Sequence, residues 1–175
     1  MSSELPETFA LGQWGEDIVR FGLGLYHCKV LDVPNDINAQ LEHGDMVVQG
    51  LSVLGLPGLK IEVKTERKWT GHLFWEWWSN KKDGRPGWGQ TSPADELFYL
   101  FADTNQGYRL KDVSRLKWLI DYSKDRFKLV PQNKYKQNND SWGYLVPVTW
   151  FAQHDITEFN FSKITEKVGP APERK

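Results

Sequence analysis

The stretch LKIEVKTE, residues 59–66, constrains the fold most, because its apolar and charged residues alternate with the period of a β-strand. Ile61 and Val63 would lie on one face of this strand, and Glu62 and Lys64 would lie on the other, roughly 7 Å apart. An acid and a base on one face suit either a half-buried strand whose polar face meets water or a chemical site. The rest of the chain has to separate these two interpretations.

Periodic patterns elsewhere predict a helix first and then several strands. The first helix should run from Thr8 to about Leu25, with Phe9, Leu11, Trp14, Ile18, Val19 and Phe21 as its apolar positions. Strands are expected at 29–33, 44–50, 60–66 and 72–79, and as a pair within 96–110.

The later part of the chain predicts one long helix and one more strand. The helix should cover residues 111–124, and an edge strand should end near Pro147 and lead into a short helical piece. Ser92 followed by Pro93 is typical of a helix start. The order of elements predicts an α/β (α+β) fold, in which helices flank a mixed central β-sheet.

The length of 175 residues fits a single domain, expected over 1–168, followed by a flexible tail over 169–175. The single Cys28 cannot form an internal disulfide, which favours a reducing compartment. The chain contains no basic segment followed by a long apolar run at its start, and no stretch of about 20 apolar residues. We therefore expect a cytoplasmic protein that makes no membrane contact.

Charge is distributed unevenly along the chain although the formal net charge is only −1. Residues 1–50 contain two Lys/Arg and eight Asp/Glu, whereas residues 51–136 contain sixteen Lys/Arg and ten Asp/Glu. This distribution is compatible with a DNA-binding face beside a metal-binding group of carboxylates, and equally with unrelated surface charges.

Two further carboxylates precede the strand that carries Glu62 and Lys64. Asp45 lies in the preceding predicted strand, seventeen positions before Glu62, and Glu16 lies in the first predicted helix. If neighbouring strands bring Asp45 and Glu62 together, their oxygens suit Mg²⁺ or Mn²⁺, with Glu16 as a further ligand. A lysine beside this pair can orient or deprotonate the attacking water and offset charge on a phosphate.

The segments HGDMVV and KIEVK, preceded by a helix with an inward glutamate, resemble the PD-(D/E)XK nuclease superfamily over residues 9–67. This superfamily has a restriction-endonuclease-like core and includes Holliday-junction resolvases and phage-type endonucleases. The resemblance matches Asp45 and Glu62 to the two acids of the motif and Lys64 to its lysine. Glu16 matches the first-helix glutamate of the resolvase-like branch. His43-Gly44 departs from the proline that nominally precedes the first acid.

Basic and aromatic residues after this strand are candidates for DNA contacts, with solvated loop residues as the alternative interpretation. These candidates are Arg67, Lys68, Lys81, Lys82, Arg85 and Trp88. Trp88 has a second alternative, because it could instead fill a hydrophobic gap. Glu76 would face the site if the strand at 72–79 paired with the strand at 60–66, although a rim carboxylate paired with a lysine is the preferred interpretation.

The resemblance implies a Mg²⁺- or Mn²⁺-dependent deoxyribonuclease, an endonuclease or exonuclease that hydrolyses DNA phosphodiester bonds, alone or as a homodimer. Asp45, Glu62 and Lys64 would be catalytic, and Glu16, Asp45 and Glu62 would bind the metal. The alternative is a catalytically inactive module on the same fold that binds DNA or protein. A second alternative is an unrelated α+β interaction domain in which the E-x-K pattern is coincidental.

Overall fold

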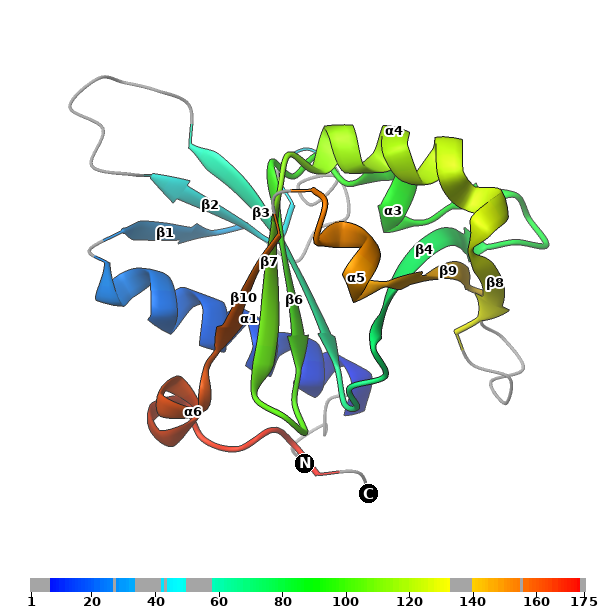
Figure 1. Ribbon diagram of the computed structural model, residues 1–175. Helices are drawn as coiled ribbons and strands as arrows, with labels where there is room; N and C mark the ends of the chain where they lie inside the picture. Colours follow the sequence, from blue (N-terminus) through cyan, green and yellow to red (C-terminus); the bar gives the residue numbers. More distant parts are fainter. Residues whose placement is uncertain are drawn as a thin grey trace.

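The computed structural model describes residues 7–26, 28–33, 42, 44–49, 58–132, 140–154 and 156–173. Two β-sheets organise these residues, and helices cover them (Figure 1). The predicted α/β class, with a mixed sheet flanked by helices, is confirmed. None of the described helices is long and apolar enough to cross a membrane.

The larger sheet has six strands in the order β1-β2-β3-β6-β7-β10. Only β3 and β6 run parallel; the other neighbouring strands are antiparallel. The bounds are β1 (Lys29–Asp32), β2 (Met46–Gln49), β3 (Leu59–Glu66), β6 (Glu96–Phe101), β7 (Gln106–Lys111) and β10 (Ile156–Asn160).

The smaller sheet is antiparallel and has the order β5-β4-β9-β8. Its strands are β4 (His72–Asn80), β5 (Arg85–Pro86), β8 (Lys128–Pro131) and β9 (Trp142–Pro147). The strand at 72–79 therefore exists as predicted, but it pairs with β9 and β5 and not with β3.

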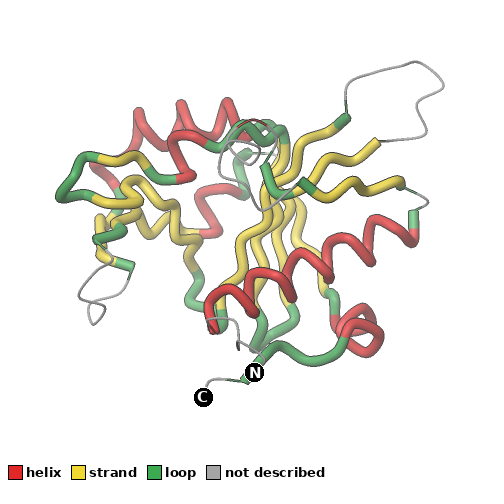
Figure 2. The backbone as a smooth tube through the Cα atoms, turned by 180° about the vertical axis from the view of Figure 1, so that it is seen from behind, coloured by secondary structure: helices red, strands yellow, loops and turns green. Residues whose placement is uncertain are grey.

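Helix α1 (Glu7–Leu25) crosses one face of the larger sheet, as Figure 2 shows from behind. Its buried residues Leu11, Trp14, Ile18 and Val19 form a core with the inner residues of β2, β3 and β6. Phe9 and Phe21 were expected on the same face but are 41% and 39% exposed. At 3.6 residues per turn, Phe9 lies about 160° around the helix from the buried Leu11, and Phe21 lies at the margin of the apolar stripe, so both reach water.

The opposite face of β6 and β7 packs against the smaller sheet and two helices, forming a second core. Helix α4 (Val113–Ser123) contributes Val113, Leu116 and Ile120 to this core. Helix α5 (Val148–Phe151) contributes Phe151, and Trp75 of β4 is fully buried there. The larger sheet is thus covered on both faces, by α1 on one side and by the smaller sheet with α4 on the other.

Three predicted features of the second half are wrong. Strand β9 is neither final nor at an edge, because it lies between β4 and β8. Pro147 is its last residue, where a missing N–H disturbs the ladder least. Residues 92–95 start no helix; instead Ser92 ends helix α3 (Trp88–Thr91).

The end of the described chain folds back on the protein. Helix α6 (Ser162–Val168) packs beside α1, and the indole N–H of Trp14 donates to the carbonyl of Gly169 at 2.9 Å. Arg67 donates to the carbonyl of Pro172 at 2.6 Å. Within residues 169–173, the segment expected to form a flexible tail therefore makes defined contacts with the domain.

Candidate active site

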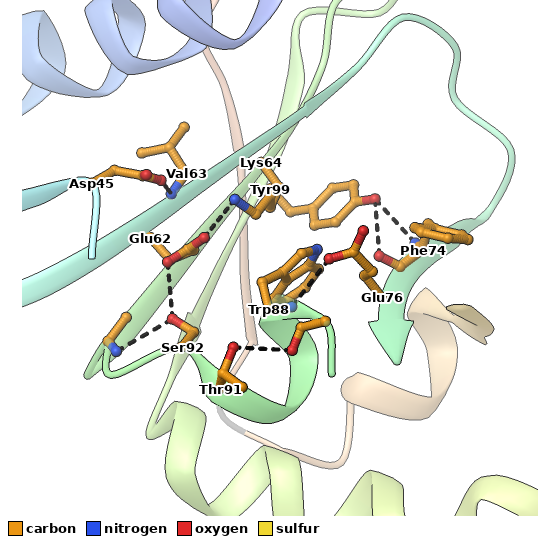
Figure 3. A network of polar contacts seen from close by, with 12 residues as sticks. Asp45, Glu62, Val63, Lys64, Phe74, Glu76, Trp88, Thr91, Ser92 and Tyr99 are labelled. Atoms are coloured by element: carbon orange, nitrogen blue, oxygen red, sulfur yellow. Dashed lines mark hydrogen bonds and ion pairs between the residues drawn. The ribbon is translucent and has the colours of Figure 1, made fainter. Parts of the chain in front are cut away.

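The alternation read from the sequence places side chains of β3 on two different faces. Ile61 and Val63 are buried in the core beneath α1. Glu62 and Lys64 project to the other face and form an ion pair (Figure 3). The Glu62 side chain is only 9% exposed and that of Lys64 is 29% exposed, so the pair lies at the margin of the protein interior.

Asp45 lies beside this pair because β2 begins only at the next residue, while β3 continues past this point. Met46, the first residue of β2, pairs with Ile61, so Asp45 stands opposite Glu62 in the same register. The Asp45 backbone N–H donates to Ile61 O at 2.9 Å, and Asp45 Oδ2 accepts from the Val63 N–H at 2.7 Å. The Asp45 carboxylate thus replaces the strand partner that Val63 lacks.

A glycine makes this turn into β2 possible. Gly44 has a φ of +76°, a conformation that side-chain-bearing residues rarely adopt, and a Cβ at this position would lie 2.8 Å from Ile61 O. Local steric limits therefore explain why a glycine stands between His43 and Asp45. His43 itself lies outside the described residues.

Glu16 reaches the same place from α1. The helix approaches β3 so closely at Gly15 that a Cβ there would lie 1.9 Å from Thr65 Oγ1. Burial, followed by the neighbouring Asp45 charge, raises the pKa of Glu16 to about 7, against an opposing effect of Arg20 and Lys64. The effect of the Asp45 charge on Glu16 is consistent with the helix bringing this third predicted carboxylate toward Asp45.

The other charged groups of the site shift the pKa values of Asp45 and Lys64. Burial is the largest cause of a raised pKa at Asp45; the Lys64 charge lowers this pKa and the Glu62 charge raises it. Burial disfavours the Lys64 ammonium, but attraction to Glu62 and Asp45 outweighs burial and raises the pKa of Lys64. Lys64 is therefore a cation at neutral pH, surrounded by more negative charge than it neutralises.

Ser92 is a site residue that the sequence did not reveal. Its hydroxyl donates to Glu62 Oε2 at 2.9 Å, and the Ala94 N–H donates to the same hydroxyl oxygen at 3.3 Å. Lys117 of α4 donates to the Ser92 carbonyl at 2.7 Å. The segment TSPAD resembled a helix cap, and only the tertiary structure shows that the hydroxyl orients Glu62.

Glu76 lies near the site although β4 does not pair with β3. Its carboxylate accepts from the Trp88 N–H at 3.1 Å and from the Ser141 hydroxyl at 2.6 Å, and its charge contributes to the raised pKa of Lys64. Among the described residues it forms no ion pair with a lysine, which differs from the interpretation preferred on sequence grounds. Its hydrogen bonds join β4 to α3.

The candidate DNA contacts lie in different parts of the fold. Trp88 is half-buried against Trp75, with ring centroids 4.9 Å apart, and Lys64 Nζ lies 5.6 Å from its ring centroid. This packing matches the alternative in which Trp88 fills a hydrophobic gap. Arg67 and Lys68 follow β3, and Arg67 makes the contact with Pro172 described above.

Lys81, Lys82 and Arg85 lie in the hairpin of β4 and β5, the two lysines in its turn and Arg85 as the first residue of β5. The ammonium of Lys81 lies 3.9 Å from the ring centroid of Trp142, and Arg85 pairs with Asp83 at 2.7 Å. Lys82 is exposed, and its backbone N–H donates to Asp140. Arg67 and Lys68 therefore belong to a different turn from these three residues.

The carboxylates of the site provide some, but not all, of the oxygen ligands that a hard divalent cation such as Mg²⁺ needs. Within the described segments, no group of three or more His, Cys, Asp or Glu side chains is arranged to hold a metal ion. Mg²⁺ is nevertheless commonly bound by one or two carboxylates, with water and substrate phosphates completing its octahedral shell. Asp45 and Glu62 stand opposite each other, and their repulsion would be relieved by a cation, so this donor pair fits such an ion.

Comparison with known proteins does not assign the chain to a family. No family model matches the chain, and neither the curated proteins nor the solved structures contain a match. The chemistry of the site is therefore inferred from its own geometry.

Proposed function

We propose that this protein is a metal-dependent nuclease that hydrolyses phosphodiester bonds of DNA. The observation that carries the proposal is the opposition of Asp45 and Glu62 just before β2 begins, with Lys64 paired to Glu62 on the same face. The resemblance of the same three residues to the PD-(D/E)XK motif supports it. Such a site needs carboxylate oxygens for the cation and a positive group near the scissile phosphate.

Each residue has a distinct role in the proposed reaction. Asp45 and Glu62 hold Mg²⁺ or Mn²⁺, with Glu16 as an additional ligand, directly or through water. The cation supplies a Lewis acid and lowers the pKa of bound water. Ser92 keeps Glu62 oriented through its 2.9 Å hydrogen bond.

Lys64 acts through its charge. The raised pKa keeps its ammonium protonated at neutral pH, which favours orienting the attacking water and offsetting phosphate charge over removing a proton. The Lys64 side chain is 29% exposed, so the pair that it forms with Glu62 borders on solvent. The proposal includes the cytoplasmic location expected from the sequence, and a homodimer would be compatible with it.

A specific observation favours a second candidate, a module on the same fold that binds DNA or a protein without cleaving DNA. Both carboxylate oxygens of Glu62 already have partners, Lys64 at one oxygen and Ser92 at the other. A metal ion would have to share or displace the Lys64 contact. In the second candidate this contact simply stabilises the strand.

Cleavage assays separate the two candidates. Purified protein is incubated with plasmid, linear and four-way-junction DNA in the presence of Mg²⁺, Mn²⁺ or EDTA. The nuclease proposal predicts metal-dependent products that disappear in EDTA and in the Glu62→Gln variant, which keeps the side-chain shape but removes one charge. Tight DNA binding by the wild type without any product in either metal would establish the binding module instead.

A further inference from the structure

The outer face of α4 carries two large aromatic side chains that contact little of the protein. Trp118 is 65% exposed and Tyr122 is 77% exposed. Their rings are nearly parallel, with an interplanar angle of 12° and centroids 5.8 Å apart. Neither ring belongs to either hydrophobic core, so packing within the described residues does not explain them.

Cationic residues flank this pair along the same line of the helix. Arg115, Trp118 and Tyr122 are spaced by three and four residues, so they share one face of α4. Arg126 follows four residues later, in the 3-10 helix η1 (Lys124–Arg126). We call these four residues the α4 stripe.

The electrostatics of this segment favour an anionic partner. Residues 111–128 contain six Lys/Arg and three Asp. Asp121 is engaged by Lys124 at 2.8 Å, and Asp112 accepts from the Arg115 backbone N–H. Asp125 is exposed, but the side chains of Arg115 and Arg126 form no ion pair with any residue that the structure describes.

We propose that the α4 stripe binds an unpaired segment of DNA, with its aromatic rings stacking on bases and its arginines contacting phosphates. Exposed aromatic rings between cationic groups are the features that bind single strands, because every base offers a π-face while paired bases are already stacked. From Arg115 to Arg126 the stripe spans about 16 Å at the helical rise of 1.5 Å. This length matches roughly four to five nucleotides at 3.4 Å per stacked base.

The helix that carries the stripe also contacts the candidate active site. Lys117, which precedes Trp118 and lies about 100° around the helix from it, donates to the Ser92 carbonyl, and the Ser92 hydroxyl donates to Glu62. A strand bound on the outer face of α4 would therefore be held by an element that contacts the candidate active site. The inference rests on the proposed function for its choice of DNA, and it makes DNA with unpaired regions the preferred substrate class.

The test measures binding in EDTA, so that it does not depend on cleavage. Fluorescence anisotropy follows a labelled oligothymidylate of about 20 nucleotides, the corresponding duplex and an oligouridylate. The double variant Trp118→Ala/Tyr122→Ala should lose at least tenfold in affinity for the single-stranded DNA, with duplex affinity within about twofold of wild type. Trp118→Phe and Tyr122→Phe, which keep a stacking ring, should retain most of the affinity.

Matched controls exclude nonspecific effects. Tyr26→Ala removes an aromatic side chain that is 78% exposed at the end of α1, across the larger sheet from α4, and should leave all affinities unchanged. Arg115→Ala should weaken single-strand binding and reduce its salt dependence, because one phosphate contact is lost. Circular dichroism verifies that each variant is folded.

Several results would overturn the inference. These are no single-strand binding by the wild type, unchanged binding by the double variant, equal losses on duplex and single strand, and a preference for the RNA probe. Sedimentation showing a wild-type dimer that the double variant abolishes would assign the aromatic pair to an interface between copies. If the stripe binds single strands but the wild type cleaves no DNA in any metal, the nuclease proposal fails while this inference stands.

Discussion

The polar face of β3 holds a carboxylate near each of its two ends, but the groups that surround the two carboxylates differ. At one end Glu62 stands opposite Asp45; burial and the Glu62 charge raise the pKa of Asp45, and burial and the Asp45 charge raise that of Glu16. At the other end Glu66 accepts from the Tyr99 hydroxyl. Burial raises the pKa of Glu66, and its hydrogen bonds with Tyr99 and the Phe74 backbone oppose this rise.

This difference distinguishes a candidate chemical site from a contact that connects the two sheets. The Glu66 end is closed, because the Tyr99 hydroxyl also accepts from the Phe74 N–H at 3.0 Å and so connects the two sheets. The Asp45 end gathers negative charge that Lys64 and, at Glu16, Arg20 offset in part, and it lies where β3 extends past the start of β2. Carboxylates therefore stabilise the fold at one end, and at the other they form the cation site that we propose.

We call the Asp45 end of β3 the open end and the Glu66 end the closed end. The largest expected effect comes from removing Lys64 at the open end. Lys64→Ala should reduce cleavage by about 10²–10⁴-fold, the usual contribution of a positioned group that acts on the reacting water. It should spare metal binding, since an ammonium is not a ligand. Single-turnover cleavage and Mn²⁺ affinity are measured on the same preparation, and undiminished cleavage would remove Lys64 from the mechanism.

Glu16 gives a pH-dependent test of the open end. Its pKa is about 7 in the folded protein and 4.5 ordinarily, so the folded state retains a proton that the unfolded state loses between these values. The free energy of unfolding should therefore fall as the pH rises from about 4.5 to about 7. Glu16→Gln should remove this loss and stabilise the protein above about pH 7, by less than the roughly 3 kcal/mol of the full shift because solvent screens the partly exposed carboxyl.

Urea unfolding at several pH values measures this effect, and Glu166→Gln at an exposed position of α6 is the control. The stabilisation by Glu16→Gln should shrink toward about pH 5, where the wild-type carboxyl is protonated in the folded protein. A difference that does not change with pH would show that Glu16 is not buried among like charges.

The closed end should respond in stability alone. Tyr99→Phe removes the hydroxyl that serves both Glu66 and the Phe74 N–H, and buried polar groups without partners typically cost about 1–3 kcal/mol. Cleavage per folded molecule should stay unchanged. Tyr108→Phe is the matched control, because the Tyr108 hydroxyl makes no hydrogen bond within the described part of the chain. A cleavage defect in Tyr99→Phe would mean that the two ends are functionally coupled.

The smallest expected effect concerns the turn between β4 and β5. Charge reversal at Lys81 and Lys82 should weaken DNA binding with little dependence on sequence, and it should reduce the slope of log K against log salt by about 1–2. Lys82 is the more informative of the two, because Lys81 is engaged with Trp142. Titrations at several salt concentrations measure the slope, and an unchanged slope would place the DNA contacts elsewhere.

The local sequence was sufficient to predict the helix and the two strands that carry or adjoin Glu16, Asp45 and Glu62. The alternation in β3 predicted that Glu62 and Lys64 share a face opposite Ile61 and Val63, which the structure shows. The apolar period of α1 and the glycine-bounded β2 were also recognisable. These features depend on residues only a few positions apart, where periodicity is informative.

Features that depend on distant partners were not predictable. Strand β4 alternates clearly, but its pairing with β9 joins segments about 70 residues apart in the chain, and nothing local specifies that choice. Strand β10 was missed because ITEFN is mostly polar, and the strand lies at a sheet edge where apolar alternation is not required. Ser92 was assigned to a helix cap because the local pattern gives no sign of Glu62.

The most direct test of the account is Mn²⁺ binding followed by electron paramagnetic resonance in the presence of nuclease-resistant phosphorothioate DNA, whose oxygens complete the metal shell. The wild type and Glu66→Gln should bind Mn²⁺ with the same affinity, because Glu66 belongs to the closed end. Asp45→Asn should bind at least tenfold more weakly, because it removes one of two facing carboxylates. Equal binding by all three proteins, or a loss in Glu66→Gln as large as that in Asp45→Asn, would contradict the assignment of the metal to the open end of β3.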